Sequence, residues 1–374
     1  MSDTSNPRVL DTFLEAVRID SPSGEEAAFA RWCADRLREA GCSVRFDGTG
    51  PLSGSDSGNL IAEFPGDAEG VVVVLCAHLD TVMPGRGIRP VVADGIVRSS
   101  GDTILASDDK AGVAAIIETI RRVGESGAIT APVRVLLTTG EEIGLQGAKS
   151  ISPDDCAGDV CLVLDAHGAV GGIVGAAPTQ YTFRAEFAGV PAHAGVEPEK
   201  GRSAVVMAAK AICAMRLGRL DAVTTANVGE IHGGTATNVV SASCVIRGEC
   251  RSLDRQAADS VRLEMDAAMR AAAFEGGGTV AVDWNLEYEG FRFPSDDPSV
   301  ELVAGAVRSI GLTPSVFDTG GGSDANVLTA KGLPSIVLAC GMTDVHGTGE
   351  SIAVADLVSL VDLLVAVLTR AVAR

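Results

Sequence analysis

The sequence predicts an α/β fold, in which a mostly parallel sheet carries helices on both faces and a smaller ferredoxin-like α+β domain is inserted into the chain. Near both ends of the chain, apolar strand-like runs alternate with helix-like segments, an order typical of a parallel sheet. From Tyr181 the order changes to strand, helix, strand, strand, helix, strand, which indicates a ferredoxin-like unit. At 374 residues the chain is long enough for two cores. We therefore expect a main domain formed by residues 1–179 and 291–374, and an inserted domain at residues 180–290.

The first part of the main domain opens with two predicted helices within residues 8–40. A Ser-Pro-Ser-Gly break follows Asp20, and Gly41 marks the end of the second helix. A third helix is expected to begin at Asp108 and to run through AGVAAIIETIRRV. Apolar runs that predict strands lie at residues 71–77, 133–138 and 160–164.

The inserted domain begins with the alternating stretch YTFRAEFAGV, and TVAVDWNLEYEG is its last predicted strand. After Phe293 the first pattern returns, with a predicted helix at residues 298–310, a strand at 335–340 and a final apolar helix. The simplest explanation is one α/β domain interrupted by a smaller one.

The composition excludes some classes of partner. The net charge is −19, from 49 acidic and 30 basic residues, which disfavours nucleic acid or an anionic membrane. The nine cysteines form no C-x-x-C pair, so we expect free thiols in a reducing compartment. The N-terminus resembles no signal peptide, and no apolar run reaches membrane-spanning length. These features predict a cytoplasmic protein.

Residues able to bind metal or move protons gather where the predicted strands end. In an open α/β sheet, the ligand site lies outside the carboxyl ends of the strands. Each residue alone has an ordinary explanation, because an Asp at a helix start is usually a cap and a His at a strand end usually makes a structural hydrogen bond. A ligand site is indicated because all of these residues fall at one edge of the predicted sheet. In chain order these ends carry His78 and Asp80, Asp108 and Asp109, Glu141 and Glu142, Asp165, and Asp344 with His346.

So many carboxylates in one crevice would repel one another unless a cation neutralised them. Imidazole and carboxylate together suit Zn²⁺, and also Mn²⁺ or Co²⁺. Two histidines with three or four carboxylates exceed the needs of one tetrahedral ion and suit two ions that share a water. A carboxylate left off the metals could then act as general base, and the adjacent Glu141 and Glu142 could supply one of each role.

Seven motifs allow a comparison with a known family: HLDTV, SDDKAG, TTGEEIG, LDAHG, HAGVEPEKGRSA, GGTATN and TDVHGTGE. In this order, and over nearly the whole chain, they resemble the co-catalytic di-zinc metallopeptidases that include peptidase T, glutamate carboxypeptidase and aminoacylase. The closest resemblance is to the peptidase T-like (tripeptidase) branch. It implies a zinc-exopeptidase-like catalytic domain and a homodimer formed through an inserted lid and dimerisation domain.

The resemblance also implies a set of metal ligands. His78 and Asp165 would hold one ion, Glu142 and His346 the other, and Asp108 would bridge the two. In such enzymes the peptide bond after the bridging Asp is commonly cis.

Further roles follow from the same resemblance. Asp80 would orient His78 through its second ring nitrogen. Glu141 would be the general base for the water that bridges the metals and would pass the proton to the leaving amine. His193 would reach into a partner's site and stabilise the oxyanion, although a surface-loop His with a local hydrogen bond is the alternative.

The remaining implied residues would bind substrate. Asn238 and Arg251 would hold the substrate's backbone or terminal carboxylate, for which Arg is well shaped. Gly322, within the GGGSD stretch, would bring backbone N–H groups near the substrate. The alternatives are an ordinary strand-surface Arg and a plain turn.

The resemblance therefore predicts hydrolysis of amide bonds in short peptides, as an aminopeptidase acting on tripeptides. A carboxypeptidase or an N-acyl amino acid deacylase would use the same metal site, so these alternatives stay open. A catalytically silent, metal-dependent binding protein is a third possibility. The presence of Glu141, which is not needed for binding metal, argues against it.

Overall fold

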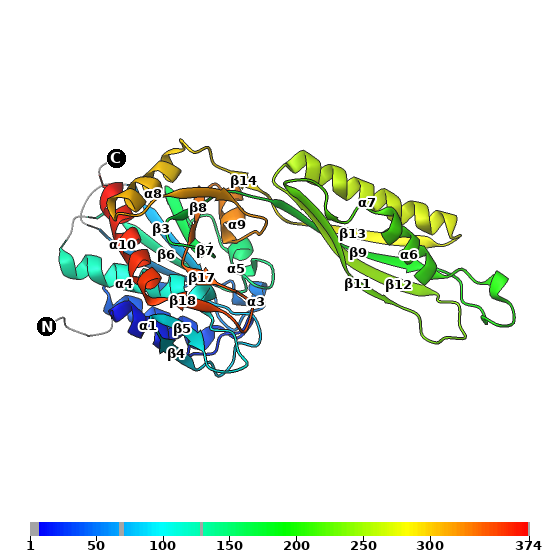
Figure 1. Cartoon of the computed structure of the whole chain (residues 1–374), viewed down its shortest axis with the longest axis horizontal. Coiled ribbons are helices and arrows are strands. Elements are labelled where there is room, and N and C mark those ends of the chain that lie inside the picture. The colour runs from blue at the N-terminus through cyan, green and yellow to red at the C-terminus, as the bar shows by residue number, and fades with distance from the viewer. Residues whose placement is uncertain (1–6, 67–70, 128–129, 373–374) are drawn as a thin grey trace. The chain divides into compact units, whose positions relative to one another are not determined.

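The computed structural model describes residues 7–66, 71–127 and 130–372 (Figure 1). The chain divides into two compact units. The main unit comprises the described residues up to Gly175, together with Phe293–Asp318 and the described residues from Ser323 on. The inserted unit comprises Ala176–Arg292 and Thr319–Gly322.

A nine-stranded sheet is the framework of the main unit. Its four central strands are parallel to one another: β6 (Val133–Thr138), β3 (Val73–His78), β7 (Val160–Ala166) and β16 (Ser335–Ala339). Antiparallel pairing extends the sheet through β2 (Leu60–Phe64) and β1 (Ser43–Phe46) on one side, and through β8 (Gly172–Ala177) and β14 (Phe291–Arg292) on the other. A short strand, β15 (Ser315–Asp318), pairs with β8. The expected mostly parallel sheet is confirmed.

Every residue of β3 is buried, because helices cover both faces of the sheet. Val73, Leu75 and Ala77 share one hydrophobic core with the larger helices α1 (Arg8–Ala16), α2 (Ala27–Glu39), α4 (Ser107–Ser126), α8 (Pro298–Ser309) and α10 (Val354–Ala371). The short helices α5 (Gln146–Ser150) and α9 (Asp324–Ala330) lie on the other side of the sheet from α4 and α10 (Figure 1).

The start of α4 is irregular. Ala106 has a left-handed backbone (φ 60°), Asp108 and Asp109 depart from helical angles, and the peptide bond between the two aspartates is cis. Further along, a Cβ on Gly112 would lie 2.9 Å from the Cβ of Leu164 on β7. The glycine therefore lets α4 approach β7 closely, next to the end of β7 that carries a site carboxylate.

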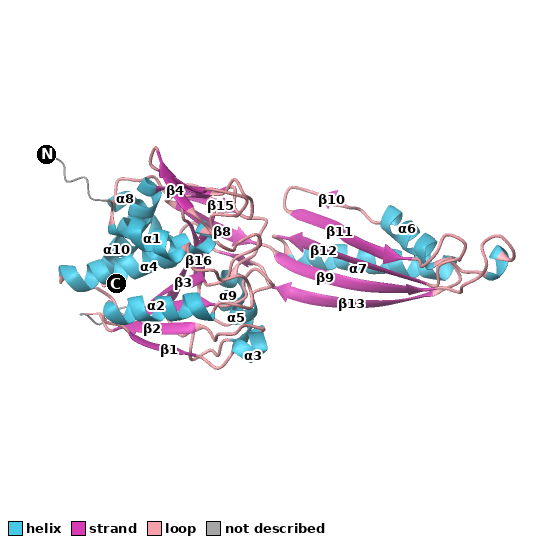
Figure 2. Cartoon of the chain, turned by 90° about the horizontal axis from the view of Figure 1, so that it is seen from below, coloured by secondary structure: helices cyan, strands magenta, loops and turns pink. Residues whose placement is uncertain are grey.

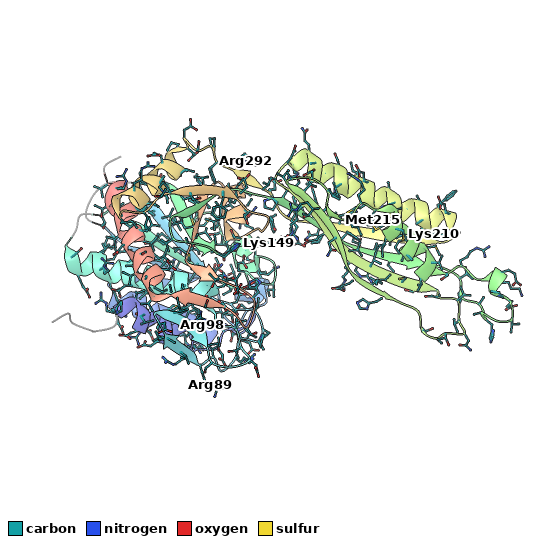
Figure 3. All side chains as sticks on the ribbon, in the orientation of Figure 1. Arg89, Arg98, Lys149, Lys210, Met215 and Arg292 are labelled. Carbon is teal, nitrogen blue, oxygen red and sulfur yellow. The ribbon has the colours of Figure 1, made fainter. Side chains whose placement is uncertain are left out.

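A small four-stranded sheet joins two distant parts of the main unit. It contains β17 (Met342–Thr343), β18 (Ser351–Ala353), β5 (Ile96–Ser99) and β4 (Pro90–Ala93), in that order. Ser351 on β18 pairs with Arg98 on β5, whose side chain is labelled in Figure 3. This pairing brings the segment around His346 beside the residues that precede α4.

The inserted unit has a sheet and a core of its own. Its antiparallel strands lie in the order β10 (Gly218–Arg219), β11 (Thr224–Gly233), β12 (Ser243–Ser252), β9 (Thr179–Ala188) and β13 (Thr279–Tyr288). Helices α6 (Ala204–Ala214) and α7 (Arg255–Glu275) pack on one face of this sheet (Figure 2). Phe183, Phe187 and Met265 belong to the core of the unit. Apart from the two-residue β10, the order is that of a ferredoxin-like fold, as predicted. Within the described residues of either unit, no helix is long and apolar enough to span a membrane.

Candidate active site

The carboxyl ends of the parallel strands bring together imidazole and carboxylate groups. His78 is the last residue of β3, Asp165 lies near the end of β7, and Glu142 follows β6. Among the described residues, three overlapping groups have donor atoms within 4.8 Å of one another: His78 with Asp108 and Asp165, His78 with Glu141 and Glu142, and Asp108 with Glu142 and His346. All residues that were expected to bind metal are thus adjacent in space.

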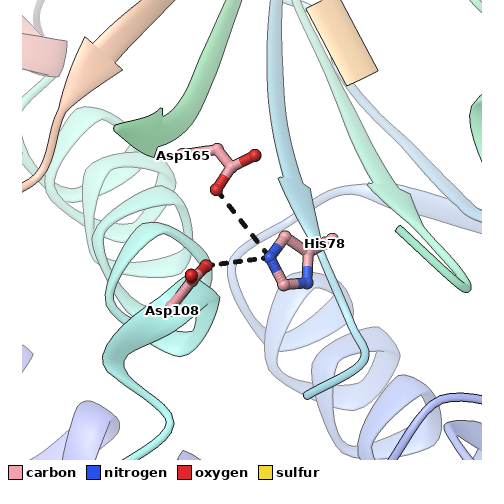
Figure 4. Close-up of side chains that lie close together, drawn as sticks. All are labelled: His78, Asp108 and Asp165. Atoms are coloured by element: carbon pink, nitrogen blue, oxygen red, sulfur yellow. Dashed lines mark hydrogen bonds and ion pairs between the residues drawn. The ribbon is translucent and has the colours of Figure 1, made fainter. Parts of the chain in front are cut away.

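Asp108 lies between the two histidines. Its Oδ1 is 3.0 Å from Nε2 of His78, and its Oδ2 is 3.2 Å from Nε2 of His346. Oδ1 of Asp165 is 3.9 Å from Nε2 of His78. Figure 4 shows that the side chains of Asp108 and Asp165 both point towards this ring nitrogen. On the other side, Oε1 of Glu142 is 2.9 Å from Nε2 of His346. Each carboxylate oxygen of Asp108 therefore faces a different histidine, an arrangement that suits a bridging ligand.

The second ring nitrogen of His78, Nδ1, contacts the main chain rather than a carboxylate. Its Nδ1 lies 2.9 Å from the main-chain carbonyl oxygen of Asp80, whereas the Asp80 carboxylate is 3.5 Å away. The main-chain N–H of His78 donates to Asp109. The resemblance implied that the Asp80 side chain orients the ring, but its main-chain oxygen makes the shorter contact.

The Asp80 carboxylate is completely buried and binds the turn after β6. It accepts the main-chain N–H of Glu141 at 2.9 Å and that of Glu142 at 3.2 Å, together with the hydroxyl of Ser23. A second buried carboxylate, that of Glu26, accepts the N–H of Gly140 at 3.1 Å. Two buried carboxylates thus accept hydrogen bonds from three successive main-chain N–H groups, those of Gly140, Glu141 and Glu142. These hydrogen bonds fix the turn that carries Glu141 and Glu142.

The carboxyl groups of the site carry an excess of negative charge. Burial raises the pKa of Asp165 well above its usual range, and the charge of Asp108 raises it further. Burial also raises the pKa of Glu141, with a contribution from Asp165. Groups that disfavour each other's ionisation in this way require a cation if all are to be ionised.

The histidines experience the same negative field. Burial alone would lower the pKa of His78, but hydrogen bonds with Asp108 and Asp80 outweigh it and raise this pKa well above its usual value. Hydrogen bonds to Asp108 and Glu142 raise the pKa of His346 to about 10. The residues present therefore fit divalent cations: the donors are nitrogen and oxygen, they converge, and their field favours positive charge.

Sequence reasoning missed three buried carboxylates around the site: Glu26, Asp324 and Glu350. Asp324 accepts a hydrogen bond from Thr138, and its Oδ1 has no hydrogen-bond partner. Each of the three lies within or beside a Gly- and Ser-rich stretch, SGEE, GGGSD or HGTGE. Such stretches indicate loops, but nothing in them shows that the acidic side chain points inward.

In the inserted unit, His193 and Asn238 lie next to each other on the surface. His193 forms an isolated bridge with Val239, and the N–H of Ala194 donates to the carbonyl of Asn238 at 2.9 Å. Nδ1 of His193 accepts the N–H of Gly195 at 3.2 Å. Both side chains are exposed. The structure thus brings this predicted pair together within its own unit.

Elsewhere in the inserted unit, Arg251 lies beside the loop that contains Gly322. The guanidinium of Arg251 donates to both oxygens of Glu249 and to the carbonyl of Gly320, at 3.0, 2.8 and 3.5 Å. It also lies 3.5 Å from the hydroxyl of Tyr288. A Cβ on Gly322 would lie 2.2 Å from the Tyr288 ring, so only glycine fits there. Arg251 is therefore not an isolated surface arginine, because it holds the glycine-rich loop.

A hollow of about 320 Å³ opens in the main unit beside the end of β7. Its walls are mostly small or apolar, and His167, two residues after Asp165, contributes the imidazole that lines it. The hollow is large enough for an amino-acid side chain. Its other lining residues are Gly168, Ala169, Val170, Gly171, Gly172, Thr313, Ser315, Phe317 and Ala339.

Convergent histidines and carboxylates at the end of a parallel sheet, with a further acid beside them, define the class of metal-dependent hydrolases. A family model described as "Peptidase family M20/M25/M40" matches residues 74–370. The chain belongs to this peptidase family.

Individual relatives agree with the assignment. The crystal structure of an aminopeptidase, PepT, from Bacillus cereus is 41% identical, with 98% of each chain covered and a TM-score of 0.91. A tripeptidase from Staphylococcus aureus is 33% identical, with 98% of each chain covered and a TM-score of 0.94. A peptidase T from Halothermothrix orenii is 23% identical over 423 residues, covering 96% of this chain and 98% of its own length. The resemblance to the peptidase T-like branch is confirmed, and the chain is a metal-dependent peptidase.

Proposed function

We propose that this chain is an aminopeptidase that releases the amino-terminal residue of tripeptides, using two divalent ions and Glu141 as general base. The observation that carries the proposal is the position of Asp108, whose two oxygens face His78 and His346 separately. Relatives above 30% identity that are described as an aminopeptidase and a tripeptidase support the choice of substrate.

In this proposal His78 and Asp165 would hold one ion, Glu142 and His346 would hold the other, and Asp108 would be a ligand of both. Zn²⁺ suits this donor set best, with Mn²⁺ and Co²⁺ as alternatives. Bound there, two divalent ions polarise the scissile carbonyl and lower the pKa of the attacking water.

Glu141 moves the proton. Its carboxylate takes a proton from the water that attacks the scissile carbonyl carbon, and then donates that proton to the nitrogen of the leaving amine as the C–N bond breaks. Asp80 keeps Glu141 in place by accepting its main-chain N–H, and the Glu141 carboxylate lies within 4.8 Å of donor atoms of His78 and Glu142. Because Glu142 would be the metal ligand of this pair, the carboxylate of Glu141 remains available to accept the proton.

We assign substrate contacts to the inserted unit. Because Nδ1 of His193 accepts a hydrogen bond, its proton lies on Nε2, which can then donate to an oxyanion in the site of a partner subunit. Asn238 and Arg251 hold the peptide's backbone or terminal carboxylate, and the loop of Gly322 presents main-chain N–H groups.

The proposed division of labour follows the two units. Residues 1–179 and 291–374 form the catalytic domain, except for the loop Thr319–Gly322, which belongs to the inserted unit. Residues 180–290 form a lid through which two chains pair as a homodimer. The boundaries of the compact units, at Gly175/Ala176 and Arg292/Phe293, lie close to these limits. We place the enzyme in the cytoplasm, because all nine cysteines are free thiols, which suits a reducing compartment.

A panel of di- and tripeptides, each free and N-blocked, tests the proposal when metal content is measured alongside. Free tripeptides should be cleaved fastest, with release of the amino-terminal residue. Release of the carboxyl-terminal residue would indicate a carboxypeptidase instead, and preference for N-acyl amino acids a deacylase. Binding of metal without turnover of any amide would indicate the silent binding protein.

A further inference from the structure

Glu350 is a buried glutamate that belongs to none of the predicted groups of site residues. It lies four residues after His346, immediately before β18, and is 1% exposed. Its carboxylate accepts four hydrogen bonds from four consecutive residues that lead into α4. The donors are the N–H groups of Leu105 and Ala106, both at 2.8 Å, the hydroxyl of Ser107 at 2.5 Å and the N–H of Asp108 at 3.0 Å.

These donors are too deeply buried to bind water in place of Glu350. Leu105, Ala106 and Ser107 have 0% exposure, and Asp108 has 9%, so solvent cannot replace the carboxylate. The segment is not a regular helix, since Ala106 has a left-handed backbone. A charged acceptor that binds several donors at once is among the stronger anchors in proteins. Glu350 therefore determines where the main chain of Asp108 lies.

The short segment that carries Glu350 also carries His346. Nε2 of His346 is 3.2 Å from Oδ2 of Asp108, while Glu350 accepts the main-chain N–H of Asp108. The segment from His346 to Glu350 thus contacts Asp108 at both its side chain and its main chain. The partners are 242 residues apart in sequence.

We propose that Glu350 is a positioning residue that sets the separation between Asp108 and His346, and thereby the affinity for the ion shared by Asp108, Glu142 and His346. The proposal rests on the proposed two-ion function. Glu350 does not touch that ion or the substrate; it acts through the main chain of Asp108. The competing explanation is that Glu350 merely anchors a loop, which would affect stability but not metal affinity.

Glu350→Gln tests the proposal, because glutamine offers one acceptor oxygen where glutamate offers two. The full-length protein, freed of metal, is titrated with Mn²⁺ by calorimetry. We expect binding of the ion shared by Asp108, Glu142 and His346 to weaken by about 10–100-fold, the range typical of partners behind a metal ligand. Binding of the second ion, whose proposed ligands include Asp108 but not His346, should weaken by a smaller factor. Excess Mn²⁺ should restore peptidase activity to the variant.

The matched control is Glu118→Gln. Like Glu350, Glu118 is a buried glutamate, but it lies on α4 and its carboxylate binds Arg8 at a distance from the site residues. This variant should bind both ions as the wild type does, even if its thermal unfolding temperature falls.

Wild-type affinity for both ions in a folded Glu350→Gln protein would overturn the proposal and leave Glu350 as a loop anchor. If that variant does not fold, Ser107→Ala decides, since it removes only the hydroxyl donor to Glu350. Ser107→Ala should weaken the same binding step by a smaller factor, and unchanged affinity would again overturn the proposal. A wild-type protein that binds fewer than two ions would instead contradict the proposed function.

Discussion

The two units hold their functional residues in different ways. In the main unit, His78 and Asp80 are 2% and 0% exposed, and buried carboxylates hold the main chain around them. In the inserted unit, His193 and Asn238 are exposed, and only local contacts hold their loops. The fold therefore fixes the buried groups of the main unit in advance, whereas local contacts alone hold the exposed pair of the inserted unit. We expect the largest effects from changes at the buried edge.

Removal of metal should have the largest effect. Dialysis against a chelator should abolish peptidase activity, and Zn²⁺, Mn²⁺ or Co²⁺ should restore it, because the donors converge on sites for cations. Circular dichroism should remain that of a folded α/β protein, since the core below the site consists of aliphatic packing. Full activity in a verified metal-free preparation would contradict the mechanism.

Glu141→Gln should come next. We expect kcat to fall by about 10²–10⁴-fold with little change in KM, because the variant keeps the shape of the side chain but cannot take up a proton. Metal content, measured by atomic emission, should stay at the wild-type value. Glu142→Gln is the matched control and should lose metal. Turnover of every tested amide at the wild-type rate would refute the role of Glu141.

His193→Ala tests the exposed side of the comparison. Loss of one oxyanion donor should lower kcat by about 10²–10³-fold while metal content stays unchanged. If the residue acts in the partner subunit's site, mixing His193→Ala with Glu141→Ala should recover part of the activity after subunit exchange. Absence of recovery, despite demonstrated exchange, would place His193 in its own chain's site or outside catalysis.

Asp80→Asn should have the smallest of these effects. An amide keeps one acceptor but turns its NH₂ towards N–H groups of the Glu141–Glu142 turn, so we expect kcat/KM to fall by about 10–100-fold. The free energy of unfolding should fall by about 1–3 kcal/mol, the usual cost of an unsatisfied buried group. Denaturant titration and steady-state kinetics measure the two effects.

Asp254→Asn in the inserted unit is the control for Asp80. Asp254 also accepts two main-chain N–H groups, at the start of α7, but its side chain caps a helix on the protein surface. Its loss should cost about 1 kcal/mol of stability or less and leave kcat unchanged. Equal effects of the two variants on kcat would contradict the view that the buried edge is specially arranged.

Much of the fold could be predicted from local pattern. The runs at residues 71–77, 133–138 and 160–164 correspond to β3, β6 and β7, because strands buried on both faces are continuously apolar. The small strands β4 and β5 were not predicted. They are four residues each, β4 is mostly exposed and β5 has a single buried residue, so no run or alternation marks them. They nevertheless help to hold the His346 segment beside the start of α4.

Local sequence patterns are sufficient to predict which chemical groups stand at the ends of the strands. His78 must lie at the end of an apolar run, and Asp165 must do the same, because side-chain alternation and strand length are local properties. The main-chain groups that the remaining carboxylates bind depend instead on the folded arrangement of the chain. The Asp80 carboxylate accepts hydrogen bonds from the main-chain N–H groups of Glu141 and Glu142. The Glu350 carboxylate accepts one from Ser107, more than 240 residues earlier. Such partners depend on how the whole chain folds back on itself, and no local pattern of residues encodes that.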